Sequence, residues 1–252
     1  FDGGDNYNSY HNSQQQAVQT TSSVMKRVYF KMFLGLLVTA FVSLFCATSS
    51  AYLSFMSGHR IFFWGLLIAE VGIVIYLSTR LTRISSATAN LLFYVFAAIN
   101  GLALAPIFLV YTMTSIAKTF FICAGTFGAM SVYGYFTTKD LTSWGNFLMY
   151  ALMGLIIASL VNIFTRSTQL DWIISIAGVL IFIGLTAWDT QKIKRMALTT
   201  PPAYISHLAT IGALSLYLDF INLFLYLLRF FGSQLIACKQ TLITEIIYLN
   251  IQ

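Results

Sequence analysis

Long stretches of the chain carry almost no charged side chains. They cover residues 32–58, 61–79, 84–117, 119–138, 141–165, 172–188 and 196–228. Only Glu70 interrupts the second stretch, and only His207 and Asp219 interrupt the last. An α-helix needs about 20 such residues to cross the hydrocarbon core of a bilayer. The pattern therefore predicts an all-α membrane protein with about seven transmembrane helices.

The run 84–117 is longer than one span needs. Two spans joined by a turn would take about 40 residues, so we interpret the run as one helix with a polar end. Pro106 lies near its middle and lacks the N–H that a helix interior requires, so we expect a kink there.

Composition agrees with a membrane location. Of the 252 residues, 58% are hydrophobic and 9% are charged, whereas soluble domains carry about 25% charged residues. A soluble core of this size could not hide so many apolar side chains. A bilayer accepts them, provided that each spanning helix satisfies its own backbone hydrogen bonds.

The two ends of the chain differ from its central part. Residues 1–24 are rich in Asn, Gln and Ser and lack the basic start of a secretory signal, so we expect a polar, disordered cytoplasmic tail. Residues 25–232 form the predicted transmembrane domain. Residues 233–252 are too few and too polar to span, and we interpret them as a C-terminal tail.

The basic residues indicate the orientation, because Lys and Arg accumulate in cytoplasmic loops. If the amino end is inside, nine basic residues fall in inner segments (Lys26, Arg27, Lys31, Arg80, Arg83, Lys139, Lys192, Lys194 and Arg195) and five in outer ones (Arg60, Lys118, Arg166, Arg229 and Lys239). We therefore expect a cytoplasmic N-terminus. The net charge of +6 largely reflects this bias. The sequence contains no basic stripe with interleaved aromatic residues, so nothing in it indicates nucleic-acid binding.

Cysteine and motif patterns argue against several chemistries. Cys46, Cys123 and Cys238 form no CxxC pair and no Cys/His spacing suited to zinc. His207, at the mouth of the last span, is interpreted as an interfacial side chain. The sequence contains no dinucleotide-binding, P-loop or nucleophile-elbow motif. We therefore expect neither an enzyme nor a bound cofactor.

Three acids lie within the predicted spans: Glu70, Asp189 and Asp219. An ionised carboxylate in hydrocarbon costs about 2.5–3.5 kcal/mol on insertion scales, so such groups usually face a cavity, pair with a cation or stay protonated. The alternative is a purely structural role, in which each acid hydrogen-bonds to neighbouring helices. Two carboxyl groups within a few ångströms would share a proton and sense pH. Deprotonated, their oxygens would suit a hard cation such as Ca²⁺.

Four segments resemble one family of membrane proteins. GLTAWDTQKIK (184–194) and GALSLYLDFINLFLYLLRFFG (212–232) are similar to the last two helices of the transmembrane Bax inhibitor family, and the second is nearly diagnostic. IAEVGIVIYL (68–77) and INGLALAPIF (99–108) resemble its second and third helices. The resemblance covers residues 25–232. It implies a bacterial-type member with seven helices, the last surrounded by the other six.

The resemblance also implies a function, namely a pH-sensitive calcium leak in a bacterial cytoplasmic membrane. Asp189 and Asp219 match the family's aspartate pair, which would act as pH sensor and gate and hold Ca²⁺ transiently. Glu70 matches a glutamate of the second helix and lies on the possible cation pathway. Relatives latch the pair with an arginine; the matching position is not an arginine here, so Arg80, with Arg83 close by, is the candidate.

Two other functions stay open. Some relatives modulate a membrane protease or cell-death and stress factors, so the protein could be a non-conducting regulator with a membrane-protein partner. A proton-coupled transporter is a weaker third hypothesis, because the sequence contains no pair of inverted repeats. The expected partners are the lipid bilayer, Ca²⁺ and protons, and not nucleic acid. The sequence leaves the oligomeric state open.

The positions of the two aspartates along their helices require an explanation. Asp189 lies near the predicted cytoplasmic edge, whereas Asp219 is about 15 residues past Tyr204, or roughly 22 Å along a straight helix. They meet only if the sixth helix extends through Arg195, or if the seventh begins near residue 205 and crosses steeply.

We expect cysteines placed at Lys139 and Lys194 to react with a membrane-impermeant thiol reagent only from the cytoplasmic side, and a cysteine at Arg166 only from the other side. The reason is the asymmetry of the basic loops. Labelling in intact cells and in opened membranes measures this, and the reverse pattern would overturn the orientation.

Overall fold

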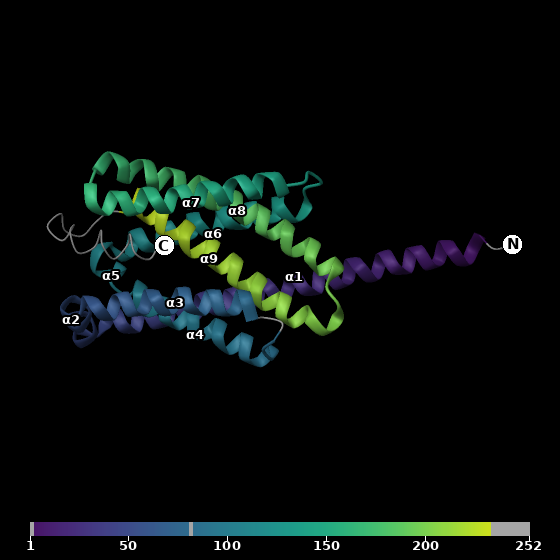
Figure 1. Cartoon of the computed structure of the whole chain (residues 1–252), viewed down its shortest axis with the longest axis horizontal. Coiled ribbons are helices and arrows are strands. Elements are labelled where there is room, and N and C mark those ends of the chain that lie inside the picture. The colour runs from purple at the N-terminus through teal and green to yellow at the C-terminus, as the bar shows by residue number, and fades with distance from the viewer. Residues whose placement is uncertain (1–2, 81–82, 233–252) are drawn as a thin grey trace.

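The computed structural model describes the backbone of residues 3–80 and 83–232, with side chains from residue 18 onward except at 57, 60 and 63. Throughout this part of the chain the regular structure is helical, and no strand is formed. The long helices pack together in one bundle (Figure 1). The prediction of an all-α protein is therefore confirmed for the described residues.

The described residues form nine α-helices and one 3₁₀ turn. In chain order they are α1 (Gly3–Thr48), α2 (Ser50–Gly58), α3 (Arg60–Arg80), α4 (Ser86–Leu104), α5 (Ile107–Val110), α6 (Met113–Phe136), α7 (Thr142–Thr165), α8 (Thr168–Thr199), η1 (Pro202–Tyr204) and α9 (Ile205–Phe231). The short α2 and α5 lie at the same end of the bundle as the α7–α8 connection (Figure 1). The longer helices therefore run back and forth between two ends.

Within the described residues, six segments are long and apolar enough to cross a membrane. They are Val18–Thr48 of α1, Ser86–Val110 of α4 and α5, α6, α7, α8, and Pro202–Phe231 of η1 and α9. The predicted count of seven is therefore not matched. The difference is α3, which is helical over the expected residues but is not among the six.

The centre of the bundle is α9. It packs against α1, α4, α6 and α8, and 72% of its most apolar stretch is buried, compared with 17% for α7. In Figure 1 it crosses the bundle obliquely, between the α3 and α4 pair and the α7 and α8 pair. Tyr217 and Tyr226, both on α9, have no exposed surface. Enclosure by the other helices thus buries polar as well as apolar side chains of α9.

The first helix begins far earlier than its span. Its backbone is helical from Gly3, so most of the segment expected to be a disordered tail instead forms helical turns that project away from the bundle (Figure 1). An existing helix extends at low cost, because each added residue gains a hydrogen bond without a new nucleus. The predicted C-terminal tail, residues 233–252, lies outside the described residues.

The run 84–117 is not one kinked helix. α4 ends before Pro106 and α6 begins already at Met113, so the run contains a complete break. Pro106 precedes the short α5, and its ring and missing N–H prevent α4 from continuing. Thr112 then caps α6, because its side chain accepts a hydrogen bond from the N–H of Ser115 at 3.2 Å.

Two glycines allow close approaches between helices. A Cβ atom at Gly134 of α6 would overlap the backbone of Ala187 on α8, and one at Gly178 of α8 would overlap the ring of Tyr226 on α9. Small residues at such crossings let helix backbones pack closely in a bilayer. Because Ala187 is two residues from Asp189, the first crossing also fixes the height of that acid in the bundle.

We expect Gly134→Ala to lower the thermal stability of the purified protein, because overpacking costs typically about 1–3 kcal/mol. Gly128→Ala, in the same helix, is the matched control: a Cβ atom there meets nothing within 4 Å, and alanine favours a helix by roughly 1 kcal/mol. Thermal unfolding in detergent should give a lower midpoint for the first variant only. Equal midpoints would contradict the close approach.

Candidate functional site

A cavity of about 340 Å³ lies among α3, α4, α7, α8 and α9. Most of its lining is apolar, but all three acids of the predicted spans reach it: Glu70 from α3, Asp189 from α8 and Asp219 from α9. The amides of Asn100 and Asn222 also line it. The structure therefore brings together carboxyl groups that lie far apart in the sequence.

The helix ends explain why the two aspartates meet. α8 continues to Thr199, well past Asp189, and α9 begins at Ile205. Counted from the connection between these helices, Asp189 lies about 15 Å back along α8 and Asp219 about 21 Å along α9. α9 crosses the bundle obliquely (Figure 1), and the two aspartates line the same cavity. The long sixth helix and the early start of the seventh, which the sequence required for a meeting, are both present.

Asp219 is the most enclosed of the three acids. It is 5% exposed, and its Oδ2 atom has no hydrogen-bond partner among the described residues. Asp189 is partly buried and close enough to repel it electrostatically. Lys192 attracts both carboxylates, and its Nζ atom lies 4.6 Å from the ring centroid of Trp188. The pair therefore has a basic side chain within electrostatic reach, one turn along α8.

A buried chain of hydrogen bonds holds Glu70. The Asn100 amide donates to Glu70 Oε1 at 3.3 Å, and the Tyr217 hydroxyl donates to Asn100 Oδ1 at 3.1 Å. The hydroxyls of Tyr217 and Thr39 are 2.6 Å apart. The chain joins α3, α4, α9 and α1, and it orients the glutamate through uncharged groups.

Sequence reasoning did not identify Asn100, Tyr217 or Thr39 as parts of the site. Asn100 did offer a signal, because an amide inside an uncharged span usually has a buried hydrogen-bond partner. Tyr217 and Thr39 offered none. Hydroxyl groups are frequent in membrane helices, and only the tertiary structure shows which of them meet.

Two hydrogen bonds join the α6–α7 connection to α8 just beyond Asp189. Gln191 donates from Nε2 to the Lys139 carbonyl at 2.8 Å, and its Oε1 accepts from the Leu141 N–H at 2.9 Å. The Gln191 side chain is buried. These two bonds satisfy backbone groups of the connection and hold α8 in place next to the aspartate.

A surface ion pair extends this attachment. Arg195 donates from Nη1 to Asp140 Oδ1 at 2.7 Å. Hydrogen bonds from Thr142, followed by that from Arg195, lower the pKa of Asp140 from 3.8 to about 2. Because the folded-state pKa is depressed, the stabilisation is present above about pH 4 and is lost as the pH falls toward 2. Asp140 therefore stays ionised near neutral pH and cannot act as a sensor there.

The two candidate latch arginines lie away from the acids. Arg80 and Arg83 are both exposed, and neither lines the cavity. His207 has a structural contact instead, with Nε2 2.9 Å from the Ile84 carbonyl oxygen. The arginine latch stays a prediction, and Lys192, which lies one turn from Asp189 on α8, is a further basic candidate.

Nothing in the described part of the chain resembles a preformed metal site. No group of three or more His, Cys, Asp or Glu side chains there is arranged to hold a metal ion. Cys46 and Cys123 are free and buried, and Cys238 lies outside the described residues. Tight Ca²⁺ sites use about six to eight oxygen ligands. The cavity can therefore offer carboxyl and amide oxygens for passing contacts with a cation, and no closed cage.

A family model described as "Inhibitor of apoptosis-promoting Bax1" matches residues 21–235. This range contains every residue that lines the cavity. The chain belongs to this Bax inhibitor family. The resemblance of the four segments is therefore confirmed at the level of the family, and the protein is an integral membrane protein.

Several curated proteins are similar to the chain over most of its length. The inner membrane protein YbhL of Escherichia coli (strain K12) is 47% identical over 213 residues, which cover 83% of this chain and 91% of that protein. The uncharacterized protein RP147 of Rickettsia prowazekii is 46% identical over 83% of this chain and 89% of its own length. An uncharacterized protein of Borreliella burgdorferi is 43% identical, with 88% and 96% covered.

We expect Tyr217→Phe to destabilise the protein, because the change removes a hydroxyl that buried Asn100 and Thr39 share. Thr39 keeps its bond to the Ala97 carbonyl, but Asn100 Oδ1 loses the donor from Tyr217, and leaving a buried acceptor without a partner costs about 1–3 kcal/mol. Tyr133→Phe is the matched control, since Tyr133 is 46% exposed. Thermal unfolding in detergent compares the two, and equally small shifts would show that the hydrogen-bonded chain adds no stability.

Proposed function

We propose that the protein is a pH-sensitive cation leak channel, with Ca²⁺ as its permeant ion and with Asp189 and Asp219 as its gate. The observation that carries this proposal is the cavity, in which three carboxyl groups from α3, α8 and α9 meet inside a membrane-spanning bundle. Membership in the Bax inhibitor family supports it. The proposed activity requires no enzymatic step and no bound cofactor.

The acids in the cavity favour cations. Ionisable side chains inside membrane proteins mark ion pathways, and carboxylates select cations in channels. Carboxylate and amide oxygens are hard ligands, which suit Ca²⁺. Because few of them are assembled here, an ion would bind weakly enough to leave again, as conduction requires.

Protons operate the gate in this proposal. Asp189 and Asp219 repel each other, and Asp219 Oδ2 lacks a hydrogen-bond partner among the described residues. Two such groups take up protons as one coupled unit. Protonation removes both their mutual repulsion and their attraction to Lys192, so the packing of α9 against α8 becomes dependent on pH.

We also propose that α3 is a seventh span and that the N-terminus is cytoplasmic. The segment before α3 contains Tyr52, whose hydroxyl donates to the Leu102 carbonyl at 2.8 Å. The segment after α3 contains Ile84, whose carbonyl oxygen contacts His207. With 21 residues, α3 is about 31 Å long, close to the thickness of the hydrocarbon core. The Escherichia coli relative is named an inner membrane protein, and we assign this chain to the same membrane.

Calcium flux into proteoliposomes, measured across pH, tests the proposal. The purified full-length protein should conduct Ca²⁺ without any partner, and its rate should change with pH near neutrality. A non-conducting regulator of a membrane protease or of stress factors would produce no flux. Absence of flux at every pH would therefore overturn the leak and favour the regulator.

Variants in the same assay test the gate. Asp189→Asn and Asp219→Asn should each abolish or strongly shift the pH dependence, because asparagine keeps the shape of the side chain but cannot titrate. Combining them should add little, as expected for one coupled unit. Asp140→Asn is the matched control, because that carboxylate is exposed and outside the cavity. Wild-type pH profiles for both cavity variants would leave the acids with a packing role only.

Further variants distinguish the possible latches. If Lys192 holds the pair in the closed packing, Lys192→Gln should raise the flux at neutral pH, because a buried carboxylate that loses its cation disfavours that packing. If the second-helix latch of the family operates, Arg80→Ala should have this effect and Arg83→Ala a smaller one. Unchanged flux in all three variants would mean that none of these side chains latches the pair.

A further inference from the structure

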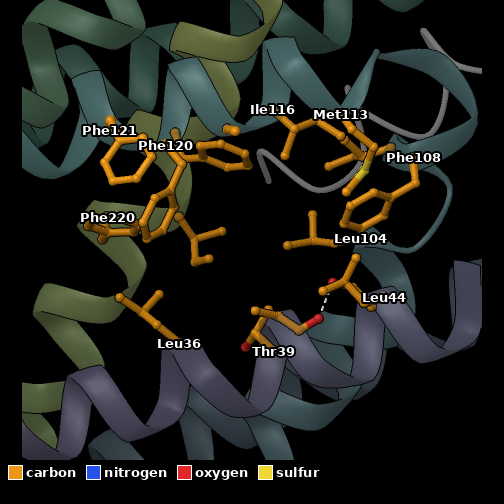
Figure 2. A pocket seen from close by; sticks show the side chains of 16 residues that line it. Leu36, Thr39, Leu44, Leu104, Phe108, Met113, Ile116, Phe120, Phe121 and Phe220 are labelled. Atoms are coloured by element: carbon orange, nitrogen blue, oxygen red, sulfur yellow. Dashed lines mark hydrogen bonds between the residues drawn. The ribbon is translucent and has the colours of Figure 1, made fainter.

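A second cavity, of about 320 Å³, lies against the opposite face of α9. Phe220 and Phe224 point toward it, whereas Leu218 and Asn222, on the other face of α9, line the cavity that holds the acids. The remaining walls come from α1, α6 and the α4–α5 region. Figure 2 shows Leu36 and Thr39 of α1 below the open space, Phe120 and Phe121 of α6 above it, and Phe220 of α9 at its left edge.

The walls of this second cavity are almost entirely hydrocarbon. Thr39 and Ser43 contribute the only hydroxyl groups, and both already donate to carbonyls: Thr39 to Ala97 at 2.8 Å, and Ser43 to Ala40 at 3.2 Å. Water needs two to four polar partners to occupy such a site, and an apolar cavity of about 150 Å³ takes up benzene. The chemistry of this cavity therefore suits a hydrocarbon ligand larger than one aromatic ring.

The cavity opens toward the surroundings of the bundle. Met113, Phe120 and Phe121 belong to its lining and are 59%, 43% and 73% exposed. All three lie on α6, one of the membrane-spanning segments, so the medium outside the opening is lipid. An empty space of this size would forfeit the dispersion contacts of its walls. Lipid acyl chains are the hydrocarbon that is always present at the opening.

We propose that this cavity binds one acyl chain of a membrane phospholipid. A charged side chain favours a phospholipid over an uncharged lipid. Lys118 directly follows Ala117, a lining residue, and it is exposed. A lysine stem can lie along apolar surface while its ammonium group reaches the head-group region, where it attracts anionic phosphate.

The bound chain would contact the helix on which the gate depends. Thr39, in the cavity wall, meets the Tyr217 hydroxyl, from which hydrogen bonds lead through Asn100 to Glu70. Ile221 lines both cavities. An acyl chain therefore supports α9 from the side opposite the acids. This consequence rests on the proposed leak function, but the binding site itself does not.

Photo-crosslinking tests the site directly. The full-length protein is reconstituted in vesicles of phosphatidylethanolamine and phosphatidylglycerol that contain phosphatidylglycerol with a diazirine in one acyl chain, and the adducts are mapped by mass spectrometry. Adducts should concentrate on peptides that contain Phe108, Phe120 and Phe220. Ala117→Phe, which fills the cavity, should reduce these adducts about tenfold. Ala129→Phe, at an exposed position of α6 outside the cavity, is the matched control and should leave them unchanged.

A second variant and a competitor keep the test decisive. Lys118→Gln, a surface change, should lower the adduct yield from the phosphatidylglycerol probe, and an unchanged yield would overturn the assignment to an anionic phospholipid. Displacement of the probe by free palmitate, but not by unlabelled phosphatidylglycerol, would identify a fatty acid as the ligand and contradict the proposal. Adducts spread evenly over all lipid-facing helices would show that there is no site. Because no ion flux is measured, these outcomes are independent of the leak.

Discussion

Inside the hydrocarbon core of a bilayer, a polar group can form hydrogen bonds only with other groups of the protein. This constraint explains why the bundle is built around α9, which carries Tyr217 and Asp219 near its middle. The surrounding helices exclude lipid from both side chains, and Thr39 and Asn100 provide partners for the tyrosine. Oxygen Oδ2 of Asp219 is one of the exceptions among the described residues. A buried polar atom without a partner calls for an explanation such as a functional role, and here it lies in the cavity.

Most of the fold could be predicted because runs without charge report directly on the medium that surrounds a helix. Hydropathy does not indicate where a helix begins or ends, because helix ends depend on local backbone hydrogen bonds. For this reason the break at Pro106, the start of α6 at Met113 and the extension of α1 to Gly3 all differ from expectation. The projecting turns of α1 are polar, so no hydropathy pattern could have marked them as part of a membrane helix.

The acids of the candidate site could be predicted from the sequence, but the hydrogen bonds that link them to other side chains could not. Glu70, Asp189 and Asp219 stand out one by one, because each is an acid in an apolar run. Spacing along the sequence put the two aspartates at different depths, so it did not predict that they meet. That expectation came from the family resemblance alone. The contacts of Asn100 and Tyr217 depend on how α4 and α9 are rotated about their axes. When every face of a helix is apolar, a single sequence contains little information about that rotation.

The central position of α9 has a consequence for biogenesis. Among the described helices it is the last to leave the ribosome, so the helices made before it must wait in the membrane without the element that fills their centre. During this interval Thr39 and Asn100 lack the tyrosine that later bonds to them. Intermediates with unsatisfied groups of this kind are prone to misassembly. Completion of the bundle therefore waits for the synthesis of α9, and a chain interrupted before Ile205 would reach membrane proteases with the centre of its bundle unfilled.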